Sequence, residues 1–109
     1  RLRPRELRLS HTDDRGAVIA LDQRTGASVW RQEHLRARQL NAPRYVDGLV
    51  AVGDLDGYVH WLSSDDGHFV ARYRVSHSAI RSQTLASHNT LYVSSQSGAL
   101  AALRLIREP

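Results

Sequence analysis

The sequence lacks cysteine, lysine and methionine altogether. Without cysteine the chain has no disulfide bond, no thiolate metal ligand and no cysteine nucleophile, an absence that fits many compartments and selects none. No apolar run approaches the roughly 20 residues that a membrane-spanning helix needs. The sequence opens on Arg1 without a signal-peptide pattern, so we expect a processed product or a piece of a longer protein.

The length and composition indicate one small folded unit. The 109 residues suffice for one domain and not two. Apolar residues make up 41% of the chain, which allows a modest core and argues against wholesale disorder.

The positive charge comes from arginine alone and is unevenly distributed. Residues 1–44 contain ten of the fifteen arginines and five of the eleven acids, giving +5, whereas the remainder of the chain carries −1. The excess lies above all in RLRPRELR at positions 1–8. Such an arm fits either a nucleic-acid contact or an end whose arginines are solvated. The second interpretation is favoured, because no aromatic platform or docking motif accompanies the arginines.

A repeat of 41 residues organises the rest of the chain. Gly16, Gly57 and Gly98 are separated by 41 residues each time, and each precedes a similar run: GAVIALD, GYVHWLS and GALAALR. A second turn repeats at the same spacing, and GLVAVGDLDG at 48–57 matches NTLYVSSQSG at 89–98 without a gap. The residues that we take as the repeat signature are Gly16, Leu21, Asp22, Gly26, Trp30, Gly57, Trp61, Leu62, Gly67, Gly98 and Leu103.

Each unit is expected to hold about four antiparallel strands. Short runs rich in β-formers and bounded by Asp/Gly turns are typical of strands, which the sequence predicts at 41–46, 49–53, 58–62 and 68–74. The last of these has the more polar composition. RQEHLRARQL at 31–40 is interpreted as the end of a strand plus a connection, although it contains good helix formers.

Four strands in about 40 residues predict an all-β fold made of β-propeller blades. The runs 49–53 and 58–62 are apolar on both faces, as expected where neighbouring blades pack face to face. We therefore divide the chain into a basic, poorly matching segment at 1–12 and propeller repeats at 13–109. The repeat units are 16–56, 57–97 and a partial unit at 98–109.

The phrase VIALDQRTGASVW at 18–30 resembles the repeat of quinoprotein-type (PQQ-repeat) propellers, with its A-L-D-x-x-T-G-x-x-x-W signature. Within that superfamily, residues 41–75 are similar to the penultimate blade of the BamB family, the scaffolds of outer-membrane β-barrel assembly. GDLDGYVHW at 53–61 is the most specific piece, and SGALAALRL at 97–105 resembles that family's C-terminal strand. Residues 1–12 depart from the pattern, since Arg8 and His11 fall where the next unit has apolar residues.

The resemblance implies about two and a half blades from the C-terminal part of an eight-bladed ring. It implies a non-catalytic lipoprotein scaffold at the periplasmic face of the outer membrane of a Gram-negative bacterium, its lipid anchor absent from this chain. The implied partners are the periplasmic POTRA domains of BamA and nascent outer-membrane proteins. It implies no cofactor and no metal, and it places partner contacts mostly upstream, so no contact residue is named here. By the same resemblance, the Trp at the position of Trp30 locks adjacent blades together.

The candidate chemical groups were weighed against structural roles. The six histidines show no ligand spacing, although His60 and His68 are expected to face each other across the 58–74 hairpin. Clustered carboxylates at 54, 56, 65 and 66 suit either a calcium ion or turn formation, and turn formation is favoured. Asp22 is expected to shape its own turn.

Ser76, His77 and Ser78 offer a nucleophile and a base, but without a strained elbow or an oxyanion hole we predict no catalytic role. Trp30 and Trp61 are expected to pack in the core and not to stack on a cofactor. The alternatives left open are a PQQ-dependent dehydrogenase-like fragment, which quinone titration would reveal, and a sensor propeller attached to a kinase.

The repeat yields a prediction about size. We expect the polypeptide in its native cells to have an intact mass of roughly eight 41-residue units, because a propeller removes its sheet edges only by closing. Mass spectrometry of the native protein measures this, and a mass of 12.3 kDa would contradict it.

Overall fold

The computed structural model describes residues 8–12, 16–82 and 84–106, with the backbone alone for residues 8–11. Most of the basic arm at 1–8 therefore lies outside the described residues. The ten elements of the described part are all strands: β1 (Arg8–Thr12), β2 (Val18–Asp22), β3 (Ser28–Gln32), β4 (Arg44–Val46), β5 (Leu49–Gly53), β6 (Tyr58–Ser63), β7 (Phe69–Arg74), β8 (Leu85–Ser87), β9 (Thr90–Ser94) and β10 (Leu100–Leu103). No helix among these residues is long and apolar enough to cross a membrane.

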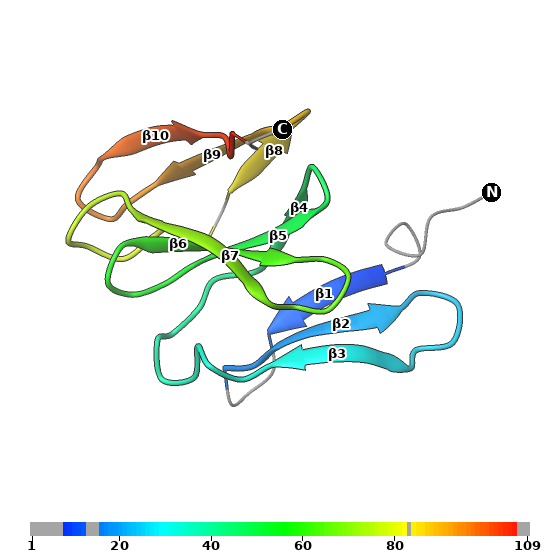
Figure 1. Ribbon diagram of the computed structural model, residues 1–109. Coiled ribbons are helices and arrows are strands. Elements are labelled where there is room, and N and C mark those ends of the chain that lie inside the picture. The colour runs from blue at the N-terminus through cyan, green and yellow to red at the C-terminus, as the bar shows by residue number, and fades with distance from the viewer. Residues whose placement is uncertain (1–7, 13–15, 83, 107–109) are drawn as a thin grey trace.

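The strands form three antiparallel sheets that follow one another along the chain and lie as successive layers (Figure 1). The central sheet has four strands in the order β4-β5-β6-β7. The flanking sheets have three each, β1-β2-β3 and β8-β9-β10. The predicted all-β fold with four-stranded antiparallel units is thus confirmed.

The sequence repeat is also a repeat of strand register. Val50 pairs with Leu62 in the central sheet, and the same pair recurs 41 residues later as Leu91 and Leu103. It also occurs 41 residues earlier, where Leu9 in β1 pairs with Leu21. Residues 8–12 of the segment that the sequence set apart therefore form a strand in repeat register, while residues 1–7 lie outside the described part.

The local turns explain where the strands begin and end. The two-residue loop between β4 and β5 is Asp47–Gly48, and both residues have positive φ, the geometry that a tight antiparallel hairpin favours. β3 ends at Gln32 and residues 33–40 form turns, as the sequence predicted. Ala37 and Gln39 in this connection have φ values of 65° and 51°, which helix interiors do not tolerate.

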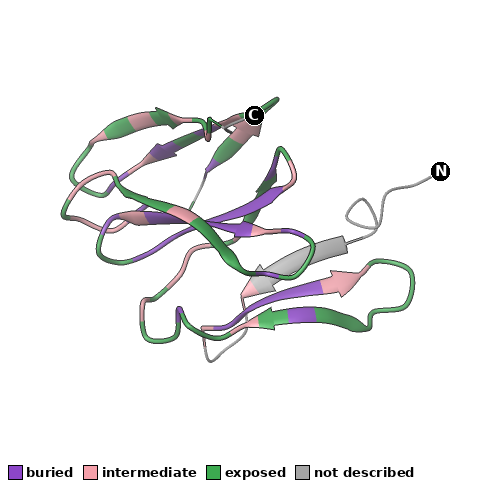
Figure 2. Cartoon of the chain, viewed as in Figure 1, coloured by how far each residue is buried: buried purple, intermediate pink, exposed green. Residues whose placement is uncertain are grey.

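The central sheet is buried on both faces, and its strands β5 and β6 carry most of the buried residues (Figure 2). On one face Ala51 and Trp61 pack with Leu91 of the third sheet. On the other face Val50 and Leu62 pack with the first sheet, in a cluster completed by Val18, Ala20, Trp30, Leu35 and Val52. The apolar composition of both faces, read from the sequence, thus corresponds to sheet-on-sheet packing.

Gly57 is the glycine that the fold constrains most tightly. Its φ is +91°, and a Cβ at this position would overlap the carbonyl oxygens of Ser76 and Ser78. Its own carbonyl accepts the Val75 N–H at 2.8 Å, so the turn before β6 is fixed against the connection that follows β7. The recurrent glycine therefore serves close backbone approach as well as turn geometry.

This difference can be tested with two matched substitutions in the intact protein. Gly57→Ala should lower the free energy of unfolding by at least about 3 kcal/mol, because two backbone carbonyls must move. Gly26→Ala, at φ +75° with open space around it, should cost only the backbone strain of about 1–2 kcal/mol. Urea titration measures both, and equal losses would contradict the packing role of Gly57.

Candidate functional site

Trp30 joins the first and second sheets. Its indole Nε1–H donates a hydrogen bond to the Ser64 carbonyl at 2.9 Å, and its ring lies directly over Gly67, where any Cβ would overlap it. Gln32 adds a side-chain bond to the Gly67 carbonyl at 2.8 Å. A tryptophan of one repeat is thus seated on a glycine of the next, and both Trp30 and Trp61 are buried in core clusters.

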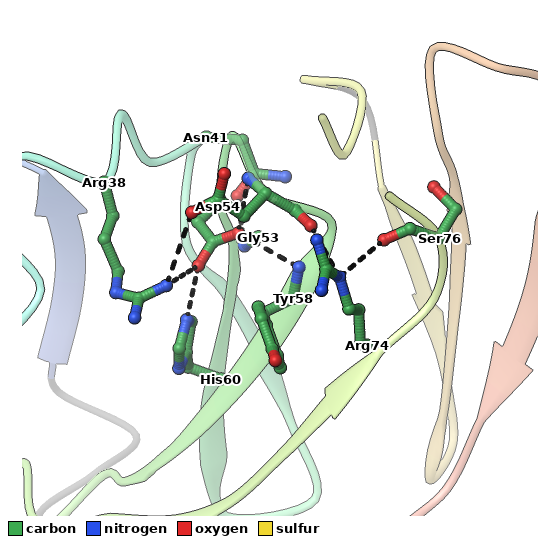
Figure 3. A network of polar contacts seen from close by, with 9 residues as sticks. Arg38, Asn41, Gly53, Asp54, Tyr58, His60, Arg74 and Ser76 are labelled. Atoms are coloured by element: carbon green, nitrogen blue, oxygen red, sulfur yellow. Dashed lines mark hydrogen bonds and ion pairs between the residues drawn. The ribbon is translucent and has the colours of Figure 1, made fainter. Parts of the chain in front are cut away.

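Asp54 is the centre of the main polar network, shown in Figure 3. Its side chain is fully buried at the turn between β5 and β6. Oδ1 accepts the N–H groups of Asp56 at 2.9 Å and Tyr58 at 3.0 Å. Oδ2 accepts from Arg38 Nη1 at 2.9 Å and pairs with His60 Nε2 at 2.8 Å. One carboxylate therefore connects its own turn, the next strand and the connection after β3.

The same turn one repeat later shows which of these bonds the fold requires. Ser95 stands in the place of Asp54, and its hydroxyl accepts the Ala99 N–H at 3.2 Å. The backbone bond that closes the turn is 2.9 Å in both copies, from Asp54 N to the Tyr58 carbonyl and from Ser95 N to the Ala99 carbonyl. One acceptor oxygen is enough for the turn. The second oxygen of Asp54, with its bonds to His60 and Arg38, is therefore an addition specific to the junction between the first and second sheets.

The environment fixes the protonation of this pair. Burial alone raises the pKa of Asp54, but hydrogen bonds from His60, the Tyr58 N–H and Arg38 outweigh it and hold the pKa below its usual value of 3.8. Burial lowers the pKa of His60 below 6.5; Asp54 opposes that shift, and the charges of Arg38 and Arg72 add to it. At neutral pH a neutral imidazole therefore donates its Nε2–H to an ionised carboxylate.

Three arginines surround one phenol ring beside this network. The guanidinium carbons of Arg38, Arg72 and Arg74 lie 5.8, 5.0 and 5.1 Å from the centroid of Tyr58, within the range of cation–π attraction. Arg74 also donates from Nε to the carbonyls of Asp56 and Ser76, both at 3.1 Å. The positive charge here is concentrated on the face of β6 and β7 that is turned toward the first sheet.

A cavity of about 330 Å³ opens on that same face. Its aromatic and apolar walls include His34, Leu35 and Phe69, and the rings of His34 and Phe69 are stacked with their centroids 6.3 Å apart. His60 lies edge-on to Phe69, with the two ring centroids 6.4 Å apart. Arg38 and Arg72 complete the lining. The arrangement combines an aromatic slot with guanidinium groups beside it.

A larger hollow of about 830 Å³ lies between the connections at 39–41 and 79–82. Asn41 spans its wall by accepting the Gly53 N–H at 2.7 Å and donating to the Arg81 carbonyl at 3.1 Å. These bonds tie the two connections to β5. The amide of Asn41 is therefore occupied with holding the backbone.

The other candidates from the sequence take part in turns. His60 lies opposite Arg72, and His68 bonds through Nδ1 to Asp66 at 2.6 Å, so the expectation that His60 and His68 face each other is wrong. The register shift next to Trp61, where β6 and β7 pair, and the Asp66 turn account for this. Asp22 shapes its own turn by accepting the Arg24 N–H at 2.8 Å.

Ser76 and Ser78 bond to each other at 3.2 Å, and Ser78 bonds onward to Ser97 at 2.9 Å, so these hydroxyls link neighbouring turns. Within the described part of the chain, no three His, Cys, Asp or Glu side chains gather as a metal site. Sequence reasoning did not find Arg38 and Arg72 as partners of the Asp54 network, because they lie 16 and 18 residues away from it on either side.

The fold and the repeat define a β-propeller built from PQQ-like repeats. A family model described as "Outer membrane protein assembly factor BamB" matches residues 6–107. The chain therefore belongs to the BamB family.

Individual relatives agree with this assignment. The chain is 38% identical over 96 residues to the BamB of Alkalilimnicola ehrlichii, covering 88% of this chain and 25% of that protein. It is 44% identical over 87 residues to the BamB of Pseudomonas aeruginosa, covering 80% and 23%. The crystal structure of BamB from Moraxella catarrhalis matches with a TM-score of 0.83 at 27% identity, covering 92% of this chain and 29% of that one. The chain thus spans about a quarter of the length of these curated relatives.

The Asp54–His60 pair predicts how stability depends on pH. Because the folded pKa of His60 is below 6.5, the unfolded state binds a proton first as pH falls, so the free energy of unfolding should decrease below about pH 6.5. The slope cannot exceed about 1.4 kcal/mol per pH unit for one proton. The depressed pKa of Asp54 adds a second loss as pH falls below 3.8.

The variant His60→Gln isolates the histidine contribution, since the Gln amide can still donate to Asp54 but does not titrate. Denaturant titrations from pH 7.5 to 5 should show a steeper loss for the original protein than for the variant. Parallel curves would show that His60 has the same pKa in both states.

Proposed function

We propose that this chain is part of a non-catalytic propeller scaffold that serves the assembly of outer-membrane β-barrel proteins. The observation that carries the proposal is how the buried polar groups are used. Among the described residues, every buried side-chain nitrogen or oxygen has a hydrogen-bond partner. These partners are turns, strand ends and the neighbouring sheet, so the buried polar chemistry is committed to holding three sheets in register.

Rigid sheets of this kind suit the display of loops and outer strands to protein partners. The outer strand β7 is exposed, with Phe69, Val70 and Tyr73 at 41%, 46% and 55% exposure. By family membership we infer that the principal partner is the periplasmic POTRA region of BamA, with nascent outer-membrane proteins as further clients. The corresponding location is the periplasmic face of the outer membrane, reached through a lipid anchor outside this chain.

The proposal is tested in cells by the contact that joins the first two sheets. In the intact protein, Trp30→Ala should remove a buried aromatic side chain at a cost of about 3–5 kcal/mol. We expect it to lower the amount of folded β-barrel protein in the outer-membrane fraction, measured by heat-modifiable gel mobility. Val29→Ala is the matched control, because Val29 is 39% exposed and its truncation should change stability by less than about 0.5 kcal/mol.

Purified intact protein should also bind immobilised POTRA domains, and it should turn over no quinone substrate. Loss of the protein without any loss of assembled β-barrel proteins would refute the assembly role. Calcium-dependent quinone reduction would replace it with a redox role.

A further inference from the structure

We propose that the cavity between the first and second sheets binds a short acidic–aromatic peptide motif, an aromatic side chain next to an Asp or Glu. The aromatic group would enter the slot beside His34 and Phe69, and the carboxylate would pair with Arg72. The inference goes beyond the assembly role, because it rests on the chemistry of this pocket alone.

The shape of the cavity selects the aromatic part of the motif. Its volume of about 330 Å³ is at the small end of ligand pockets, which suits one side chain with its neighbouring backbone. His34 and Phe69 are both exposed at its mouth, with ring planes only 14° apart. A flat ring can stack on such a surface and gain more than an aliphatic group of equal area.

The charges select the acidic part. Arg38 is already paired with the buried Asp54 at 2.9 Å, and Arg74 donates to two backbone carbonyls. Arg72 forms no ion pair within the described residues, and its guanidinium rests on the Tyr58 ring at 5.0 Å. An exposed guanidinium positioned on an aromatic face is well placed to donate to an incoming carboxylate.

The repeat shows that this pocket is not a by-product of blade packing. One unit earlier, the positions of Tyr58, His60 and Phe69 are taken by Ala17, Ile19 and Ser28. One unit later, the first two are Ala99 and Ala101, and the position of Arg38 is Ala79. Arg31, which corresponds to Arg72, pairs with Glu33 at 3.8 Å instead. Aromatic walls and an arginine available to a ligand therefore coincide at this one junction of the described chain.

The test is fluorescence anisotropy with the intact protein and three fluorescein-labelled peptides that differ in two positions: Gly-Ser-Phe-Glu-Gly-Ser, the same peptide with Lys for Glu, and the same peptide with Ala for Phe. The Phe-Glu peptide should bind more tightly than both others, and added salt should weaken it. Equal binding of the three peptides, or no binding of the first at millimolar concentration, overturns the proposal.

Two exposed-site variants locate the binding. R72Q should weaken Phe-Glu binding about two- to fivefold, as expected for a solvent-exposed ion pair. F69A should weaken it about two- to tenfold. The controls are R104Q, an exposed arginine outside the cavity, and Y73A, on the opposite face of β7; both should bind as the original protein does. Unchanged affinity in R72Q and F69A overturns the site, whereas the assembly role is judged separately by outer-membrane protein levels.

Discussion

The need to cover both faces of the central sheet governs this structure. Strands β5 and β6 are apolar on each side, and exposing either face to water would cost about 25 cal/mol for every Å² of apolar surface. Val50 and Leu62 are covered by the first sheet, while Ala51 and Trp61 are covered by the third. The unit of stability is therefore a stack of sheets, and a single four-stranded sheet would not bury its own core.

The polar contacts refine what the apolar packing allows. Asp54 performs two tasks with its two oxygens: one closes a turn that recurs in every blade, and the other binds His60 and Arg38 across one junction. The second task requires a buried charge, which is tolerated because four donors surround the carboxylate. The same junction holds the aromatic cavity, so this face of the central sheet combines a common scaffold with local additions.

Much of the fold could be predicted from residues close together in sequence. The spacing of Gly16, Gly57 and Gly98 fixed the strand pairing, since the register repeats with the same 41-residue shift. Strand β1 was set apart because its composition departs from the repeat, yet backbone pairing with β2 does not require matching side chains. The cavity could not be predicted, because it unites a connection at 33–38 with β6 and β7 through a packing angle that periodicity does not encode. The bulge beside Trp61 likewise changed which residues face His60.

The seating of Trp30 on Gly67 makes the repeats interchangeable in outline but not in detail. The bulky partner belongs to one unit and the space for it belongs to the next, so neither unit contains a complete contact. A duplicated, deleted or transplanted blade would bring a tryptophan against a residue with a side chain, or leave a glycine facing a void. Inheritance of such a protein therefore acts on pairs of neighbouring blades, and a change on one side of a junction restricts which changes the adjoining blade can accept.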